Sequence, residues 1–242
     1  MRLISDAAST IAAGDSTSHQ SAELPTITMI GAGNCQDIDL PTLAASFREI
    51  RLIDIDAVAV DAAVSQFAAD VTSRIRIFAP LDIAAPLMSL SAFDSHNAAN
   101  HSALLAALES SLQNEVPVSN VVVSTCLLSQ LLDSASQIVP PKSPMFLPLI
   151  QAVRRGHLAR LLCLTSAAGR ALLISDLVSS DTVPDLSRTL PAELPNLMFR
   201  CLQSGNFFSG LNPAVVLHDI QHIPACIQLC ASSRILPPCT GI

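Results

Sequence analysis

The chain has 242 residues and a formal net charge of −7; half of its residues are apolar and 14% are charged. This composition supplies a sizeable core and excludes a globally disordered chain. The negative charge argues against nucleic acid as a partner, because phosphate binding requires a basic surface. Tyrosine and tryptophan are absent, so stacking on a flat ligand falls to phenylalanine or to the backbone.

Residues 1–25 are small and polar, and predict a leader or a fragment of a cap without a signal-peptide core. No apolar run approaches the ~18 residues of a membrane span. Seven cysteines without a C-x-x-C pair indicate free thiols in a reducing compartment. We therefore expect a cytoplasmic protein with no membrane partner. We expect no metal site, because His218 and His222 have helical metal-site spacing but lack a clear third ligand.

Apolar runs alternate with helical patterns from residue 26 onward. The predicted strands span residues 26–30, 49–55, 74–80, 118–125 and 170–180. Helices are predicted at 40–47 with Asp39 as N-cap, after Asp56 as the N-cap of the next helix, around 104–112, and on both sides of 139–144. This alternation predicts an α/β fold: a doubly wound, mainly parallel sheet with helices on both faces.

The alternation fades after residue 180. Residues 191–204 predict a helix, a second short helix follows, and residues 225–236 predict one strand. We expect residues 26–180 to form the cofactor-binding core. Residues 181–242 then complete the sheet, with its last strands incomplete, and supply a substrate side.

A glycine turn, Gly31-Ala32-Gly33, ends the first predicted strand. In an open parallel sheet, ligands bind beyond the carboxyl ends of the strands, where the winding reverses. Glycine at that place permits a positive φ and lets the backbone approach a ligand. Taken alone the turn is a weak signal, because many such turns contain glycine for packing only.

Two acids follow the next two predicted strands. Asp54 comes about 20 residues after Gly31, where a carboxylate can accept hydrogen bonds from two vicinal ribose hydroxyls. Asp82 follows the third strand, where an acid can accept a hydrogen bond from an adenine amino group. Together with the glycine turn, the two acids indicate an adenosine-bearing ligand at this edge of the sheet.

A nicotinamide dinucleotide is the first alternative for that ligand. Its fingerprint requires a third glycine where this chain has Gln36. A short-chain dehydrogenase also needs a catalytic tyrosine, which the sequence lacks. These observations disfavour a short-chain dehydrogenase, but they do not exclude other NAD(P)-dependent oxidoreductases.

Residues 26–180 resemble a divergent member of the class I S-adenosylmethionine-dependent methyltransferases, a Rossmann-like family. "ITMIGAGNC" resembles the first motif of the family, "LIDID" its second-strand acid and "APLDI" its third-strand acid. "NVVVSTCLLSQL" resembles the fourth-strand motif, and "AAGRALLISDLVSSD" resembles the segment around strand five. The resemblance also implies an antiparallel last strand.

The resemblance implies S-adenosyl-L-methionine as the cofactor and methyl transfer to an unidentified small-molecule or protein acceptor. The glycine turn would approach the methionine part, Asp54 the ribose and Asp82 the adenine, while the end of the fourth strand would form the floor of the site. The candidate cofactor-binding residues are Gly31, Ala32, Gly33, Asn34, Asp54, Ile55, Asp82, Ile83, Ser124 and Thr125.

The chain departs from the family pattern in several places. Cys35 replaces the third glycine of the first motif, Met29 replaces the acid often found near the end of strand one, and the Asn/Asp-Pro-Pro-Tyr motif is absent. A non-catalytic methyltransferase-like binding domain is therefore a second hypothesis. No catalytic residue is assigned, because methyl transfer depends mainly on in-line placement. His96 and His101 are the candidate general bases.

Overall fold

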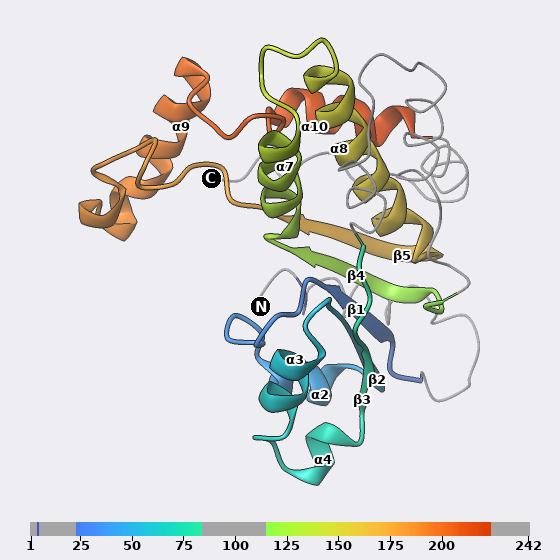
Figure 1. Ribbon diagram of the computed structural model, residues 1–242. Coiled ribbons are helices and arrows are strands. Elements are labelled where there is room, and N and C mark those ends of the chain that lie inside the picture. The colour runs from blue at the N-terminus through green and yellow to red at the C-terminus, as the bar shows by residue number, and fades with distance from the viewer. Residues whose placement is uncertain (1–3, 5–22, 84–114, 224–242) are drawn as a thin grey trace.

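A five-stranded sheet forms the centre of the computed structural model, which describes residues 4, 23–83 and 115–223 (Figure 1). The strands are β1 (Thr26–Ile30), β2 (Glu49–Ile53), β3 (Ile75–Phe78), β4 (Ser119–Thr125) and β5 (Thr165–Ile174). Every neighbouring pair is parallel, and the order is β3-β2-β1-β4-β5. The winding therefore reverses between β1 and β4, at the centre of the sheet.

Helices cover both faces of the sheet. The helices are α2 (Leu40–Ser46), α3 (Ala57–Val64), α4 (Ala69–Thr72), α7 (Leu127–Ile138), α8 (Phe146–Cys163), α9 (Leu194–Ser204) and α10 (Pro213–His222), with short 3-10 turns η2 (Leu186–Arg188) and η3 (Pro191–Glu193). Helices α2 and α3 lie on one face, and α7 and α8 lie on the other (Figure 1). The predicted doubly wound α/β fold is confirmed.

The two-sided cover explains why the central strands β1, β2 and β4 are buried along almost their whole length. Ile27 and Met29 of β1 pack in the same cluster as α2 and α3, whereas Ile30 packs on the opposite face with Val122 and Leu161. Side chains alternate between the faces of a strand, so a strand covered on both sides buries every position. In β4, the run 121–123 is fully buried for this reason.

The two predicted N-caps are confirmed. The carboxylate of Asp39 accepts a hydrogen bond from the Thr42 N–H over 3.1 Å, and that of Asp56 accepts one from the Ala59 N–H over 2.9 Å. Each satisfies a backbone donor that the first helical turn leaves without a partner. The caps therefore fix where α2 and α3 begin.

The prediction for the fifth strand was wrong in position. β5 begins at Thr165 and ends at Ile174, so Gly169 lies inside the strand and does not precede it. The pairing of β4 with β5 shifts register between Ser119 and Val121, and a Cβ atom at Gly169 would lie 2.5 Å from the Asn120 carbonyl oxygen. The glycine marks a close backbone approach at an irregularity of the strand.

The described part of the C-terminal region adds helices to this core. α10 packs against α8 through a buried ion pair, in which Arg154 Nε lies 2.6 Å from Asp219 Oδ2. α9 sits on an extension with a small apolar cluster of its own, formed around Val183, Leu197 and Cys201 (Figure 1). Across the described residues no helix is both long and apolar enough to cross a membrane.

Several predictions concern residues or strands that the structure does not describe. The helix around 104–112, the strand at 225–236 and the histidines at 96 and 101 lie outside the described residues. All five strands that the structure describes are parallel, so the antiparallel last strand implied by the family resemblance stays a prediction. The completion of the sheet by residues 181–242 stays one as well.

Candidate functional site

A cleft of about 300 Å³ lies at the carboxyl ends of the strands, where the winding reverses. Its lining comes from the glycine turn, the ends of β2 and β4, the residues after β3, and one side of α7. The lining residues are Gly31, Gly33, Ile53, Asp54, Ile55, Leu81, Asp82, Ile83, Thr125, Leu127, Gln130, Leu131 and Ser134. We call this cavity the switch-point cleft. The fold thus places most of the candidate cofactor-binding residues around a single cavity.

The two glycines of the turn serve different purposes. Both adopt the left-handed conformation, with φ of 80° at Gly31 and 51° at Gly33. A Cβ atom at Gly31 would lie 3.1 Å from Leu127 Cβ and 3.3 Å from the Thr125 carbonyl oxygen, whereas one at Gly33 would meet no atom within 4 Å. Gly31 is therefore required by packing. Gly33 leaves open space beside its backbone, where a ligand can approach.

Asp54 joins the glycine turn to the end of β2. Its Oδ2 accepts a hydrogen bond from the Gly33 N–H over 2.7 Å, and its Oδ1 accepts one from the Asp56 N–H over 2.9 Å. A carboxylate offers about four lone-pair sites, so each oxygen keeps capacity for a further donor. The side chain is half-buried and lines the cleft. It is therefore oriented by the protein and still available to a ligand.

At the end of the cleft formed by Asp82 and Ile83, a hydrogen bond connects the cleft wall to helix α8. A guanidinium nitrogen of the buried Arg160 donates a hydrogen bond to the carbonyl oxygen of Ile83, next to Asp82. Burial lowers the pKa of Arg160, and the negative charge of Asp82 opposes that shift. Arg160 therefore links α8 to the strand-end segment that carries Asp82.

Three of the sequence candidates do not line the cleft. Ala32 is buried, and Asn34 is exposed, with its side-chain oxygen 3.3 Å from the Gln36 N–H. Ser124 is fully buried, and its Oγ lies 2.8 Å from His157 Nε2. Because side chains alternate along β4, Ser124 points toward α8, while the next residue, Thr125, reaches the cleft.

The Ser124–His157 pair is closed to substrate. Nδ1 of His157 has no hydrogen-bond partner, and the side chain is 1% exposed. Burial and the neighbouring Arg160 charge lower the pKa of His157 to about 4. The imidazole is therefore neutral at neutral pH, and its hydrogen bond with the serine lies inside the core. The sequence could not show this pairing, because the two residues lie on different elements.

The α7 wall of the cleft is absent from the sequence candidates. It is formed by Leu127, Gln130, Leu131 and Ser134. Their spacing of i, i+3, i+4 and i+7 places them on one helix face. The signal was present in the sequence, since a helix that follows a central parallel strand begins at the same sheet edge as the ligand site.

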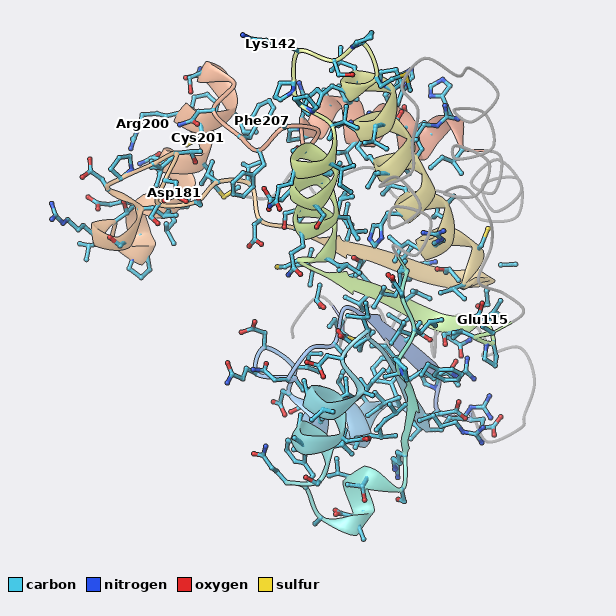
Figure 2. All side chains as sticks on the ribbon, viewed as in Figure 1. Glu115, Lys142, Asp181, Arg200, Cys201 and Phe207 are labelled. Carbon is cyan, nitrogen blue, oxygen red and sulfur yellow. The ribbon has the colours of Figure 1, made fainter. Side chains whose placement is uncertain are left out.

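The charges around the cleft are acidic. Among the described residues that line it, Asp54 and Asp82 are ionisable, and none is a lysine or an arginine. Lys142 lies in the loop between α7 and α8, at the end of these helices farther from the sheet (Figure 2). Helix α2 begins only at Leu40, and Asp39 already caps its first turn. This arrangement suits a neutral or cationic ligand better than a phosphate.

Cys35, in the loop that follows the glycine turn, is not an activated nucleophile. It is buried in a left-handed conformation with φ of 56°. Burial raises the pKa of its thiol, and the charge of Asp54 raises it further. The helix that would favour a thiolate begins five positions later, at Leu40. Cys35 therefore acts as a small core residue in the third-glycine position.

No metal centre is found in the described part of the chain, where no three His, Cys, Asp or Glu side chains gather to hold an ion. The rings of His218 and His222 on α10 stack with centroids 4.0 Å apart. Nδ1 of His222 lies 2.7 Å from the His218 carbonyl oxygen. The i, i+4 histidine spacing is thus used for contacts within the helix.

No protein-family model matches the chain, and a search of curated proteins gives no match either. A functional assignment therefore depends on the geometry and charge of the switch-point cleft.

Proposed function

We propose that the chain binds S-adenosyl-L-methionine in the switch-point cleft and transfers its methyl group to a small-molecule or protein acceptor. One observation carries the proposal. The Asp54 carboxylate is held by the Gly33 N–H on the wall of a cleft that Asp82 also lines. A strand-end acid beside a glycine turn suits the two ribose hydroxyls of an adenosine, and a second acid one strand away suits the adenine amino group.

The residues present fit the adenosine part of the cofactor and leave room for its methionine part. Asp54 has free lone pairs for the ribose, and Leu81 and Ile83 offer apolar surface beside Asp82 for the base. The open backbone at Gly33 allows close approach of the methionine part. A volume of about 300 Å³ lies at the lower end of the ~300–1,000 Å³ range of small-molecule sites. When bound, the cofactor supplies an electrophilic methyl group.

The charges favour this cofactor over a nicotinamide dinucleotide. A pyrophosphate needs N–H donors at a helix N-terminus or basic side chains. Here Asp39 occupies the start of α2, and the described lining of the cleft carries acids and no basic side chain. S-Adenosyl-L-methionine has no phosphate and carries a positive sulfonium, which the acids stabilise.

Calorimetry on the full chain tests the proposal with S-adenosylmethionine, S-adenosylhomocysteine and NAD. We expect micromolar binding of the first two ligands and none of NAD. Asp54→Asn should weaken binding at least tenfold, since the ribose loses an ionised acceptor, while Asp61→Asn on the exposed side of α3 should leave it unchanged. Binding of NAD without S-adenosylmethionine would overturn the proposal. Turnover on an acceptor panel then separates an enzyme from a binding domain.

A further inference from the structure

A second cavity, of about 520 Å³, lies on the other side of α7. Its walls come from α7, from the residues that follow β5 and from the loop before α10. The lining residues are Ser129, Gln130, Leu132, Asp133, Ser134, Ser136, Asp176, Phe208 and Ser209. We call this cavity the α7 groove. Its volume falls within the ~300–1,000 Å³ that small-molecule sites occupy.

The α7 groove adjoins the switch-point cleft. Gln130 and Ser134 line both cavities and are exposed, so the two cavities meet along one exposed ridge of α7. A second link lies at the end of β4: Thr125 lines the cleft, and burial together with the charge of Asp176 of the groove raises the pKa of the thiol of the next residue, Cys126. A ligand in the groove would therefore lie beside a ligand in the cleft.

The lining of the groove is hydroxyl-rich and acidic. Four serines and a glutamine supply polar groups, Asp133 and Asp176 supply negative charge, and Phe208 supplies an aromatic surface. None of the described residues that line the groove is a lysine, an arginine or a histidine. Asp176 accepts a hydrogen bond from Ser129 Oγ over 3.2 Å, which orients its carboxylate. Carboxylates and an aromatic face are the groups that attract an organic cation.

We propose that the α7 groove binds a small organic amine, and that this amine is the methyl acceptor of the chain. The acceptor role rests on the function proposed above, whereas binding of the amine does not. The cavity, its charge and its wall shared with the cleft carry the proposal. A carboxylic acid or a phosphate ester would meet two carboxylates there and no basic side chain.

Transfer to an amine requires a proton to leave the ammonium group. Asp176 is exposed and lines the groove, so its carboxylate can take this proton and release it to solvent. The nitrogen lone pair then forms the new bond to the methyl carbon, as the bond from that carbon to sulfur breaks with both electrons staying on sulfur. The product leaves as the methylated ammonium ion, and the sulfonium has become a neutral thioether.

An NMR titration of the ¹⁵N-labelled full chain, with S-adenosylhomocysteine present, tests the groove with three probes of equal carbon number. These are cadaverine, 1,5-pentanediol and glutarate, which carry positive, zero and negative charge. We expect cadaverine to shift the amides of residues 129–136 and 208–209, and to bind about tenfold more tightly than the diol. Equal affinity for cadaverine and the diol, or cadaverine shifts confined to other surfaces, would overturn the proposal.

Variants separate the groove from the general attraction of an acidic protein for cations. Asp176→Asn should weaken cadaverine binding about three- to fivefold, and Ser209→Lys should weaken it more. Asp181→Asn, on the extension that carries α9, is the matched control and should change nothing (Figure 2). An equal effect of Asp176→Asn and Asp181→Asn would overturn the groove site. The affinity of wild type for S-adenosylmethionine, measured separately, decides the cofactor proposal on its own.

Discussion

The Gly33 N–H donates a hydrogen bond to Asp54 Oδ2 over 2.7 Å, and this contact joins the turn after β1 to the end of β2. The Gly31 N–H adds a second link, to the Ile53 carbonyl oxygen over 3.0 Å. The turn and the strand-end acid therefore form one unit of the cleft wall. A change in either partner shifts the other, so folding and ligand binding must be measured separately in variants of this unit.

Gly31→Ala should destabilise the fold more than Gly33→Ala. Both place an alanine in the left-handed region, which costs about 1–2 kcal/mol. At Gly31 the new Cβ would also lie 3.1 Å from Leu127 Cβ, which raises the expected loss to about 2–3 kcal/mol. Urea unfolding at neutral pH measures both free energies of unfolding. Equal losses in the two variants would contradict the packing role of Gly31.

Gly33→Ala should instead weaken the binding of the cofactor to the switch-point cleft. Its Cβ meets no protein atom within 4 Å, and Gly33 lines the switch-point cleft. We expect the affinity for S-adenosylhomocysteine to fall at least about tenfold, because the methyl group occupies space that the ligand needs. Calorimetry on the folded variant measures this change. An unchanged affinity would place the ligand elsewhere.

The sequence predicted the periodic parts of the fold and the edge at which the site lies. Strand β1 agrees with its predicted bounds, and Asp39 and Asp56 cap the helices they were expected to cap. These features depend on near neighbours in the chain. The start of β5 was missed because Gly169, which directly precedes the predicted strand, lies inside β5, where a carbonyl from β4 approaches it, a contact between distant residues.

The candidate site shows the same difference between features set by near neighbours in the chain and features set by contacts between distant residues. Asp54 and Asp82 were found because strand ends of a parallel sheet share an edge. Ser124 was placed in the cleft by its motif, yet the pleat of β4 turns it toward His157. The sequence indicated that α7 begins at this edge, but which of its faces lines the cleft depends on its packing against α8 and the loop before α10, so its residues were not among the candidates.

Asp219→Asn should destabilise the fold by about 3 kcal/mol, because it leaves the charge of Arg154 buried without its partner. Both side chains of this pair are at most 7% exposed, and Arg154 also donates a hydrogen bond to the Gly210 carbonyl oxygen over 3.0 Å. Urea unfolding measures the loss. Glu23→Gln, in the exposed pair with Arg48, is the matched control and should cost less than about 1 kcal/mol.

A double variant, Arg154→Met with Asp219→Leu, distinguishes an unpaired charge from lost packing. Apolar residues of similar volume avoid the cost of burying an ion, so the double variant should be more stable than Asp219→Asn alone. If the double variant were the less stable of the two, lost packing and the lost hydrogen bond from Arg154 to Gly210, not an unpaired buried charge, would account for the destabilisation.

His157 should make the folded state sensitive to mild acid. Its pKa is lowered to about 4 in the folded chain, against about 6.5 when unfolded. As the pH falls below 6.5, the imidazole takes up a proton in the unfolded chain before it does so in the folded chain. The contribution of neutral His157 to the free energy of unfolding is therefore complete above pH 6.5 and is lost toward pH 4. We expect the loss at this site between pH 7 and pH 5 to be about 2 kcal/mol. Urea unfolding at both pH values measures it, and His157→Gln should remove this part of the pH dependence while the other histidines and the carboxylates still contribute theirs. An identical pH dependence in the two proteins would show that His157 takes up its proton in the folded chain as readily as in the unfolded one.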